Sequence, residues 1–479
     1  MKYVSAKPPW KHQVQALKAM EGQEAFALLM AMRTGKTKTL LDDWARLEAE
    51  GKVNDLLVIA PAGVYRTWEA AIQEHLGPSV CARVSVFTWA ASGGAEHDRM
   101  LGTFLGGKPR PRILLMNVEA LSAVDRARKL ALDFVKQRAT MVAVDESTTI
   151  KTPSARRARF IAEKLAPLAK YRRILTGLIA PRSPLDVYMQ FYFLDPNILG
   201  YNNFVSFRNY FAIIVKVDMG GRFPVPLIKG YRNVDELKEA IKPYSFRVKL
   251  EDCYDLPPKM YKFRDVELTV EQKRIYNDIR LKATSQLNET DHVTTDAVIT
   301  QILRLHQVLL GHVRDETGNL HEIPEKRTDS LVELLEQTEG KAIIWASYDH
   351  DVKKISERLK KEFGDVARFW GGNRATREDE EKRFLNDPKC RFMVATAAAG
   401  GRGRTWVNAD LVVYYSSTND LEHRSQSEER AQGIDKVRSV LYIDLRAPGT
   451  VEEKIIMGLR RKIDLASQIT ADGWKKWLV

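Results

Sequence analysis

Residues 26–44, FALLMAMRTGKTKTLLDDW, predict the type of fold more directly than any other stretch of this chain. An apolar run leads through a turn into Gly35-Lys36-Thr37, from which an amphipathic helix departs. This strand–loop–helix order places backbone N–H groups and the positive end of a helix where phosphates can bind. We therefore expect Lys36 to reach the β- and γ-phosphates of a nucleoside triphosphate and the Thr37 hydroxyl to bind Mg²⁺. The strict phosphate-loop pattern has a glycine at position 30, where this chain has Met30.

A second segment, MVAVDEST at residues 141–148, predicts the acidic half of the same site. Four apolar residues followed by two acids are typical of a buried parallel strand that ends in carboxylates. Asp145 is expected to hold the metal, and Glu146 to orient or deprotonate a water molecule. Either segment alone has an ordinary explanation, a chance GKT or a plain strand end. Their occurrence together favours one nucleoside-triphosphate site.

Length and composition narrow the class of protein. A chain of 479 residues with 44% hydrophobic content is expected to form two or three globular domains. No apolar stretch approaches the roughly 20 residues that span a bilayer, and the first residues lack the apolar core of a signal peptide. Three cysteines lie far apart, at Cys81, Cys253 and Cys390, without metal-ligand spacing. We expect a cytoplasmic protein with no membrane contact.

The net charge of +13 favours polyanionic partners, because neutralising phosphates releases counterions. Charge alone leaves open a basic protein without any such partner. The tryptophans Trp68, Trp89, Trp345 and Trp370 are interpreted as packing residues rather than base-stacking platforms.

The alternation of apolar and helical patterns predicts an α/β fold with two lobes and parallel sheets. Expected strands are residues 26–30, 56–60, 113–116, 141–144 and 173–176, then 262–269, 341–346, 367–370, 391–396, 411–415 and 440–445. Leu256-Pro257-Pro258 is the clearest linker, since proline cannot continue a helix. The predicted domains are residues 1–195 and 326–479 as the two α/β lobes, 196–258 as a helical insertion with the linker, and 259–325 as the start of the second lobe with its helical insertion.

Three further segments have the composition of functional loops. LVIAPAGVYRTW (57–68) is a strand followed by a turn and a helix start, a place that suits a nucleic-acid phosphate. TAAAGGRGRTWVNAD (396–410) is glycine-rich, which lets backbone approach a ligand, although it could also be a plain turn. HRSQSEERAQGIDK (423–436) sets Gln426 and Arg430 four apart, on one expected helix face.

In this order, these segments resemble the motifs of the Swi/Snf-like branch of the superfamily-two helicases. WKHQ resembles the adenine-reading segment, and AMRTGKT, APAGVYRTW and DEST resemble motifs one, Ia and two. ILTGLIAPRSP resembles motif three, while KAIIWASY, AAAGGRGRTWVNAD and QSEERAQG resemble motifs four, five and six. The resemblance covers almost the whole chain.

The resemblance implies two RecA-like lobes with helical insertions, ATP and Mg²⁺ in the cleft, and double-stranded DNA across both lobes. It implies a DNA-stimulated ATP hydrolase that translocates along duplex DNA. A compact bacterial or phage-type member is expected, monomeric, in the bacterial or infected-host cytosol, with a possible recruiting protein partner. A strand-separating or branch-migrating helicase stays open as an alternative.

The resemblance also implies a role for individual residues. Catalytic roles would fall to Lys36, Asp145, Glu146, Gln426 and Arg430, the last at the γ-phosphate. ATP would be bound by Gln13, Arg33, Thr34, Gly35, Lys36, Thr37, Lys38 and Gly403, and Mg²⁺ by Thr37 and Asp145. DNA would be bound by Pro61, Ala62, Gly63, Thr176, Gly177, Ser347, Gly400 and Gly401.

Several positions depart from the family pattern, Gly433 and Leu178 among them. Gly433 stands where motif six has the second arginine, whose positive charge can contribute about 10³–10⁵ in rate. Either Gly433 caps the helix and Lys436 or Arg438 supplies the charge, or the chain is a nucleotide-responsive DNA-binding module with impaired hydrolysis. In motif three, Leu178 lacks the hydroxyl that normally helps to couple ATP to DNA contacts.

Overall fold

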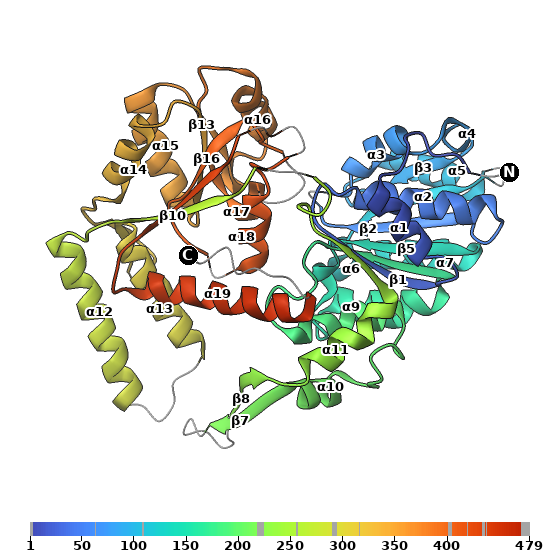
Figure 1. The fold of residues 1–479 in the computed structure, drawn as a ribbon, viewed down its shortest axis with the longest axis horizontal. Coiled ribbons are helices and arrows are strands. Elements are labelled where there is room, and N and C mark those ends of the chain that lie inside the picture. Colours follow the sequence, from blue (N-terminus) through green and yellow to red (C-terminus); the bar gives the residue numbers. More distant parts are fainter. Residues whose placement is uncertain are drawn as a thin grey trace. The chain divides into compact units, whose positions relative to one another are not determined.

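The computed structural model describes residues 3–62, 64–107, 110–217, 225–254, 257–289, 295–315, 317–400, 405–418, 420–433, 436 and 438–470. The chain divides into two compact units. The first consists mainly of Met1–Ile213 and Tyr231–Asp255, and the second mainly of Leu256–Asp464. Each unit is built around its own parallel sheet (Figure 1).

The first unit contains a seven-stranded sheet in the order β3-β4-β2-β5-β6-β1-β9. All neighbouring strands pair in parallel. The strands are β1 (Ala25–Met30), β2 (Asp55–Ala60), β3 (Ser85–Thr88), β4 (Arg112–Asn117), β5 (Thr140–Asp145), β6 (Tyr171–Leu175) and β9 (Ser245–Val248). β1, β2 and β5 are buried at every position, as a sheet covered on both faces requires.

Helices connect these strands in the order that a parallel sheet demands. They are α1 (Lys11–Ala19), α2 (Lys36–Ala49), α3 (Thr67–His75), α4 (Pro78–Cys81), α5 (Ala95–Gly106), α6 (Ala120–Ala123), α7 (Asp125–Gln137), α8 (Arg156–Arg159), α9 (Val187–Leu194), α10 (Phe204–Phe211) and α11 (Val234–Ile241). A π-helical turn, Phe160–Leu165, continues α8.

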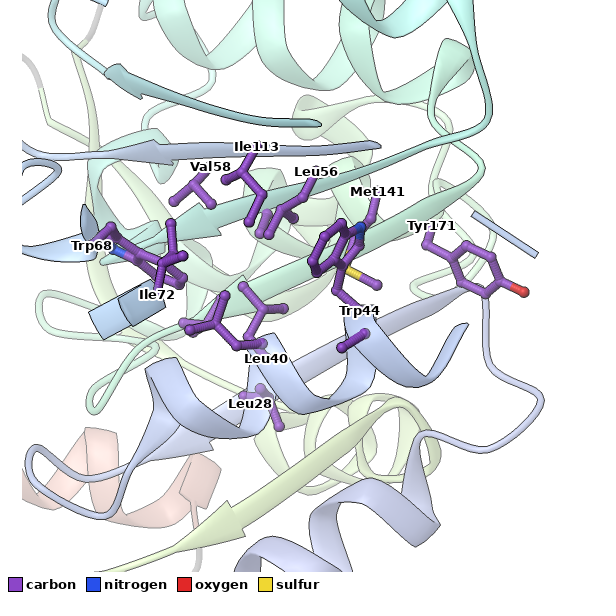
Figure 2. Packing of buried hydrophobic residues seen from close by; sticks show 14 of the residues in the cluster. Leu28, Leu40, Trp44, Leu56, Val58, Trp68, Ile72, Ile113, Met141 and Tyr171 are labelled. Carbon is purple, nitrogen blue, oxygen red and sulfur yellow. The ribbon is translucent and has the colours of Figure 1, made fainter. Parts of the chain in front are cut away.

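Alternate residues of the central strands pack against α1, α2 and α3 in one apolar cluster, shown in Figure 2. The cluster includes Leu28, Leu56, Val58 and Met141 from strands, and Leu40, Trp44, Trp68 and Ile72 from helices. The period of two in the strand residues is the expected one for a sheet with helices on this face.

The segment 196–258, expected to be a helical insertion, is only partly helical. Besides α10 and α11 it contains β7 (Ala212–Val217) and β8 (Val225–Tyr231), which form their own two-stranded sheet. Its last strand, β9, extends the sheet of the first unit by pairing with β1, from Ala27↔Ser245 to Met30↔Val248. The prediction missed β3 and β9, SVFT and SFRV, because neither has the continuous apolar run by which β1, β2 and β5 were recognised.

The second unit contains a six-stranded parallel sheet in the order β10-β17-β16-β13-β15-β14. The strands are β10 (Met260–Asp265), β13 (Lys341–Ala346), β14 (Val366–Phe369), β15 (Phe392–Thr396), β16 (Ala409–Tyr414) and β17 (Leu441–Arg446). All six were expected from the sequence. A small antiparallel pair, β11 (His312–Arg314) and β12 (Leu320–Glu322), lies outside this sheet.

The helices of the second unit are α12 (Val270–Glu289), α13 (Thr295–Leu309), α14 (Arg327–Glu336), α15 (Asp349–Phe363), α16 (Arg377–Asn386), α17 (Ala397–Gly400), α18 (Leu421–Glu428) and α19 (Val451–Thr470). α12 and α13 provide the helices expected before residue 325. The fold prediction, two α/β lobes with parallel sheets, is confirmed. Among the described residues no helix has the length and apolar character that crossing a bilayer requires.

Candidate active site

The loop between β1 and α2 has the backbone of a phosphate-binding loop. Arg33 and Gly35 both have positive φ angles, of 64° and 81°, and α2 begins directly afterwards at Lys36. The first N–H groups of a helix have no acceptor within the helix, and they carry its partial positive charge. The sequence prediction of a strand, a loop and a helix at this place is confirmed. Met30, which replaces the glycine of the strict pattern, is fully buried at the end of β1.

The predicted phosphate-binding side chains lie at this loop. The Lys36 ammonium donates a hydrogen bond to the Met30 carbonyl oxygen at 2.9 Å, inside the loop. Thr37 is the second residue of α2 and is partly exposed. The Thr34 hydroxyl donates to the Ala31 carbonyl oxygen at 2.7 Å, which makes Thr34 a residue that stabilises the loop.

Lys38 differs from its prediction as a nucleotide ligand. Its buried ammonium binds the Asp42 carboxylate at 2.5 Å and the Ser5 hydroxyl at 2.7 Å. Lys38 and Asp42 are four residues apart on α2, a spacing that brings opposite charges together. The side chain is therefore committed to α2 and the N-terminal segment, and only the Lys38 backbone N–H lies in the first turn of the helix.

Gln13 is buried against the phosphate loop. Its side-chain oxygen accepts a hydrogen bond from the Trp10 backbone N–H at 2.9 Å. Its amide nitrogen lies 3.4 Å from the Thr34 carbonyl oxygen and 3.5 Å from that of Gly35. His12 adds a ring nitrogen 2.7 Å from the same Thr34 oxygen. The structure thus brings Gln13 to the loop, with its amide nitrogen near loop carbonyl groups, and its role in binding ATP stays a prediction.

Asp145 is the last residue of β5, and Glu146 follows it at the same edge of the sheet. One Asp145 oxygen accepts from the Trp68 indole N–H at 3.0 Å, and the other accepts from the Glu146 backbone N–H at 3.0 Å. Burial raises the pKa of the Asp145 carboxyl, while the charge of Lys36 and the two hydrogen bonds oppose that rise. The charge of Lys36 thus acts on the Asp145 carboxylate.

The backbone of Glu146 is in the left-handed region, with φ 47° and ψ 59°. Among the described ranges, Arg33, Glu146 and Asn233 are the non-glycine residues with positive φ. Such conformations are uncommon, and they cluster at functional sites where the surrounding structure enforces them. Arg33 and Glu146 lie in residues 26–44 and 141–148, the two segments from which the sequence predicts a nucleotide site.

The loop after β6 packs beside the phosphate loop. A Cβ atom built on Gly177 would lie 3.6 Å from the Ala31 Cα atom, so the two backbones approach closely. Thr176 is buried, and its hydroxyl closes a turn with the backbone of Leu178 at 3.1 Å. Thr176 and Gly177 were predicted to contact DNA. The structure places Gly177 beside the β1–α2 loop, and the DNA contact stays a prediction.

Sequence reasoning missed Gln190, a fully buried residue of α9. Its amide oxygen accepts from the Ser147 hydroxyl at 2.6 Å, and its amide nitrogen donates to the carbonyl oxygens of Ile179 at 2.7 Å and Asp186 at 2.8 Å. Gln190 thereby joins the residue after Glu146 to the loop after β6. A glutamine within the apolar run VYMQFYFL was the available signal, because a buried amide needs partners.

The remaining predicted DNA-binding residues of the first unit lie after β2. Pro61 is buried and Ala62 is exposed, whereas Gly63 lies outside the described residues. The Ala62 backbone N–H donates to the Glu119 carboxylate at 3.1 Å. A backbone donor at this loop thus already binds an anionic oxygen.

In the second unit, Ser347 is exposed directly after β13, as a DNA contact requires. Gly400 is buried, and a Cβ atom built on it would lie 2.7 Å from the Trp406 ring and 3.2 Å from the Trp345 ring. Close packing is thus one reason for a glycine here, and its role in DNA binding stays a prediction. Gly401 and Gly403 lie outside the described residues.

Gln426 and Arg430 do not share a helix face, because α18 ends at Glu428. They are nevertheless neighbours: the Arg430 Nε donates to the Gln426 carbonyl oxygen at 2.9 Å. The Gln426 side chain is buried, with its amide nitrogen 3.5 Å from the Glu422 carboxylate. The four-residue spacing correctly predicted that Gln426 and Arg430 lie close together. The expected reason, a shared helix face, is wrong.

Gly433 is buried and lies beyond the end of α18, so it does not cap that helix. The Lys436 ammonium binds three acceptors: the carbonyl oxygens of Val407 at 2.8 Å and Ala409 at 2.7 Å, and the Asp410 carboxylate at 2.6 Å. Lys436 is therefore held within its own unit. Arg438, whose side chain is 82% exposed, lies 3.8 Å from the same carboxylate.

Comparison with known proteins identifies both units. Residues 12–312 match the SNF2-related domain, and residues 326–434 match the helicase conserved C-terminal domain. An uncharacterised ATP-dependent helicase of Mycoplasma genitalium is 22% identical over 96% of this chain and 41% of its own length. The chromodomain-helicase-DNA-binding protein 1-like of Danio rerio is 23% identical over 95% of this chain and 43% of its own. The chain thus spans less than half the length of these relatives.

Among solved structures, the SWI2/SNF2 ATPase core of Sulfolobus solfataricus in complex with dsDNA matches with a TM-score of 0.43. Its sequence is 21% identical, and the match covers all of this chain and 97% of that one.

Proposed function

Because this chain belongs to the SNF2-related family, with a helicase C-terminal domain as its second lobe, we propose that it is an ATP-dependent translocase on double-stranded DNA. DNA stimulates its hydrolysis of ATP. The observation that carries the proposal is that the charge of Lys36, the first residue of α2, acts on Asp145 at the end of β5, directly before Glu146. The domain limits at residues 195, 258 and 325 remain part of the proposal, as does a monomeric state.

The residues of the phosphate loop fit a nucleotide with its magnesium ion. The loop presents the first-turn N–H groups of α2 and the Lys36 ammonium, which suit phosphate oxygens. The Thr37 hydroxyl and the Asp145 carboxylate are hard oxygen ligands of the kind that Mg²⁺ prefers. Asp145 is desolvated, so its negative charge is stabilised most by a cation. Bound Mg²⁺ would supply positive charge to the phosphates.

Hydrolysis is assigned to the carboxylate of Glu146, which orients the attacking water or accepts its proton. The left-handed backbone at Glu146 turns the chain sharply after β5. Trp68 and the Glu146 N–H hold Asp145 in one orientation. The Gln190 network fixes Ser147, the next residue along the chain. A rigid surround of this kind keeps the reacting groups aligned.

DNA binding is assigned to loops that follow parallel strands in both lobes. Ala62 and Ser347 are exposed at such places, and the chain carries a net charge of +13. One relative is named as a DNA-binding protein, and one similar structure is described as a complex with dsDNA. Backbone contacts of this type position a duplex without reading its sequence. A recruiting protein partner is a further part of the proposal.

A second candidate function is a DNA-binding module that responds to nucleotide but hydrolyses it poorly. The observation that favours it is Gly433 at the position of the second motif-six arginine, together with the three acceptors that hold Lys436. Lys436 and Arg438 are the two residues that could supply the missing positive charge. Arg438 is held less tightly than Lys436, since its guanidinium lies 3.8 Å from the Asp410 carboxylate. Arg430 is present in either case.

Steady-state ATP hydrolysis with and without duplex DNA tests both candidates. The proposed motor turns over ATP faster with DNA, and Lys36→Ala abolishes turnover, whereas the matched change Lys52→Ala, at an exposed lysine just after α2, has no effect. A silent chain that Gly433→Arg activates would favour the second candidate. Turnover that survives Lys36→Ala would refute the assignment of the site.

A further inference from the structure

Trp68 is the side chain that connects the β2–α3 loop to the acidic pair. It is the second residue of α3, and its indole N–H donates to Asp145 Oδ2 at 3.0 Å. Trp68 and Asp145 are both buried. A buried carboxylate is stable only with donors at its oxygens, and an indole N–H can only donate. Trp68 therefore has a role beyond filling space.

The two hydrogen bonds to Asp145 fix the orientation of its carboxylate. Oδ1 accepts from the Glu146 N–H, which belongs to the same strand end, whereas Oδ2 accepts from a residue 77 positions earlier. The bond to Oδ2 is thus the one that depends on another element. If α3 shifts or rotates, the carboxylate must turn with it or lose this donor.

Hydrogen bonds connect the start of the β2–α3 loop to the residues just before Trp68. The Pro61 carbonyl oxygen accepts from the N–H groups of Val64 at 2.8 Å and Tyr65 at 3.0 Å. Trp68 and Ile72 then anchor α3 in the apolar cluster with α2 (Figure 2). A displacement of the loop at Pro61 is therefore transmitted through these hydrogen bonds to the residues just before Trp68.

We propose that Trp68 is a positioning residue that links occupancy of the β2–α3 loop by a DNA phosphate to the orientation of Asp145 toward Mg²⁺-nucleotide. The proposal rests on the proposed function, which places DNA at that loop and the metal at Asp145. Coupling between two binding sites is reciprocal. DNA therefore changes the affinity for nucleotide, and nucleotide changes the affinity for DNA by the same factor.

The chain offers a matched control in Trp44. Trp44 belongs to the same cluster and is equally buried, but its indole nitrogen has no hydrogen-bond partner among the residues that the structure describes. Figure 2 shows both rings. Trp44→Phe and Trp68→Phe remove the same atoms from the same core. Only the second change removes a hydrogen bond to Asp145.

The experiment measures the dissociation constant of a fluorescent ADP analogue by anisotropy, in Mg²⁺ and in EDTA, with and without saturating duplex DNA. Outer partners of metal ligands typically contribute about 10–100-fold in metal affinity. The ratio of the dissociation constant in EDTA to that in Mg²⁺ measures how much Mg²⁺ strengthens nucleotide binding. For Trp68→Phe we expect this ratio to be at least tenfold smaller than in the wild type. The affinity of Trp68→Phe for the ADP analogue in EDTA stays unchanged. The factor by which DNA changes that affinity in Mg²⁺ falls toward one. Trp44→Phe keeps both effects.

Equal behaviour of Trp68→Phe and Trp44→Phe in a wild-type background that shows coupling would overturn this inference alone. A wild type that binds no nucleotide would overturn the proposed function as well. If Trp68→Phe does not fold, β-(3-benzothienyl)alanine at position 68 keeps the bicyclic ring and has, in place of the N–H, a sulfur atom that cannot donate a hydrogen bond. The same loss of coupling is expected there, and its absence would refute the role of the hydrogen bond.

Discussion

Gly35 offers a quantitative test of the phosphate loop. It combines a positive φ of 81° with close packing, since a Cβ atom built on it would lie only 2.1 Å from the Gln13 side-chain nitrogen. In Gly35→Ala, the left-handed backbone costs about 1–2 kcal/mol for an L residue. Displacing the buried Gln13 amide costs roughly 1 kcal/mol more, because it weakens hydrogen bonds to Trp10 and Thr34. The expected loss of unfolding free energy is about 2–3 kcal/mol.

The chain provides a matched control at the other end of α2. Gly51 also has a positive φ, of 72°, but nothing lies within 4 Å of a Cβ atom built on it. Gly51→Ala therefore bears the backbone strain alone, about 1–2 kcal/mol. In a Gln13→Ala background the contact is absent. The loss of unfolding free energy caused by Gly35→Ala should then be no larger than that caused by Gly51→Ala. The double-mutant cycle isolates about 1 kcal/mol of interaction between Gly35 and Gln13.

Urea unfolding, followed by circular dichroism and by hydrogen exchange of α2 amides, measures these free energies. Binding of the ADP analogue to the folded variants gives the functional counterpart, and Gly35→Ala should weaken it far more than Gly51→Ala does. The reasoning is refuted if Gly35→Ala and Gly51→Ala are equally destabilising, or if the effects of Gly35→Ala and Gln13→Ala simply add.

Three further outcomes are expected. Burial alone would raise the pKa of Glu452, but Arg327, bonded to it at 2.6 Å, holds that pKa at about 2. The unfolded chain then binds more protons between pH 4.5 and 2, so the free energy of unfolding falls by up to about 3 kcal/mol as the pH drops through this window. Glu452→Gln should remove that part of the pH dependence in acid-titrated urea unfolding, and an unchanged slope would contradict the assignment. Gln190→Leu leaves the Ser147 hydroxyl without its acceptor, so about 1–3 kcal/mol of hydrogen bonding is lost beside Glu146. We expect kcat for ATP hydrolysis to fall about tenfold with little change in KM. A loss of stability with a normal kcat would limit Gln190 to a structural role. DNA affinity, measured by anisotropy, should fall steeply with salt, and an affinity that is flat between low and moderate salt would exclude a phosphate-tracking surface.

The elements predictable from sequence were those with long, uniform signals. The apolar runs of β1 and β5 end in GKT and Asp-Glu, and a parallel sheet brings such ends to one edge, so Lys36 and Asp145 could be placed together without coordinates. β9 could not be found, because its four residues acquire strand structure only by pairing with β1. Tertiary pairing of this kind is invisible to local pattern.

Individual side chains were harder to predict where one residue type serves two purposes. Lys38 is next to the phosphate loop in sequence, but an opposite charge four residues on holds it. Gly400 has the composition of a ligand loop, but two indole rings are one reason for a glycine there. Trp68 was interpreted as packing, which is right for its ring and misses its N–H. Such distinctions depend on partners that are distant in the sequence.

Displacement of a third strand from a triplex tests translocation directly, because a motor that moves along duplex DNA strips that strand without separating the two beneath it. We expect ATP-dependent release of the third strand from an intact duplex, and no release by Lys36→Ala. DNA-stimulated ATP turnover without any release, or release accompanied by separation of the duplex strands, would contradict it.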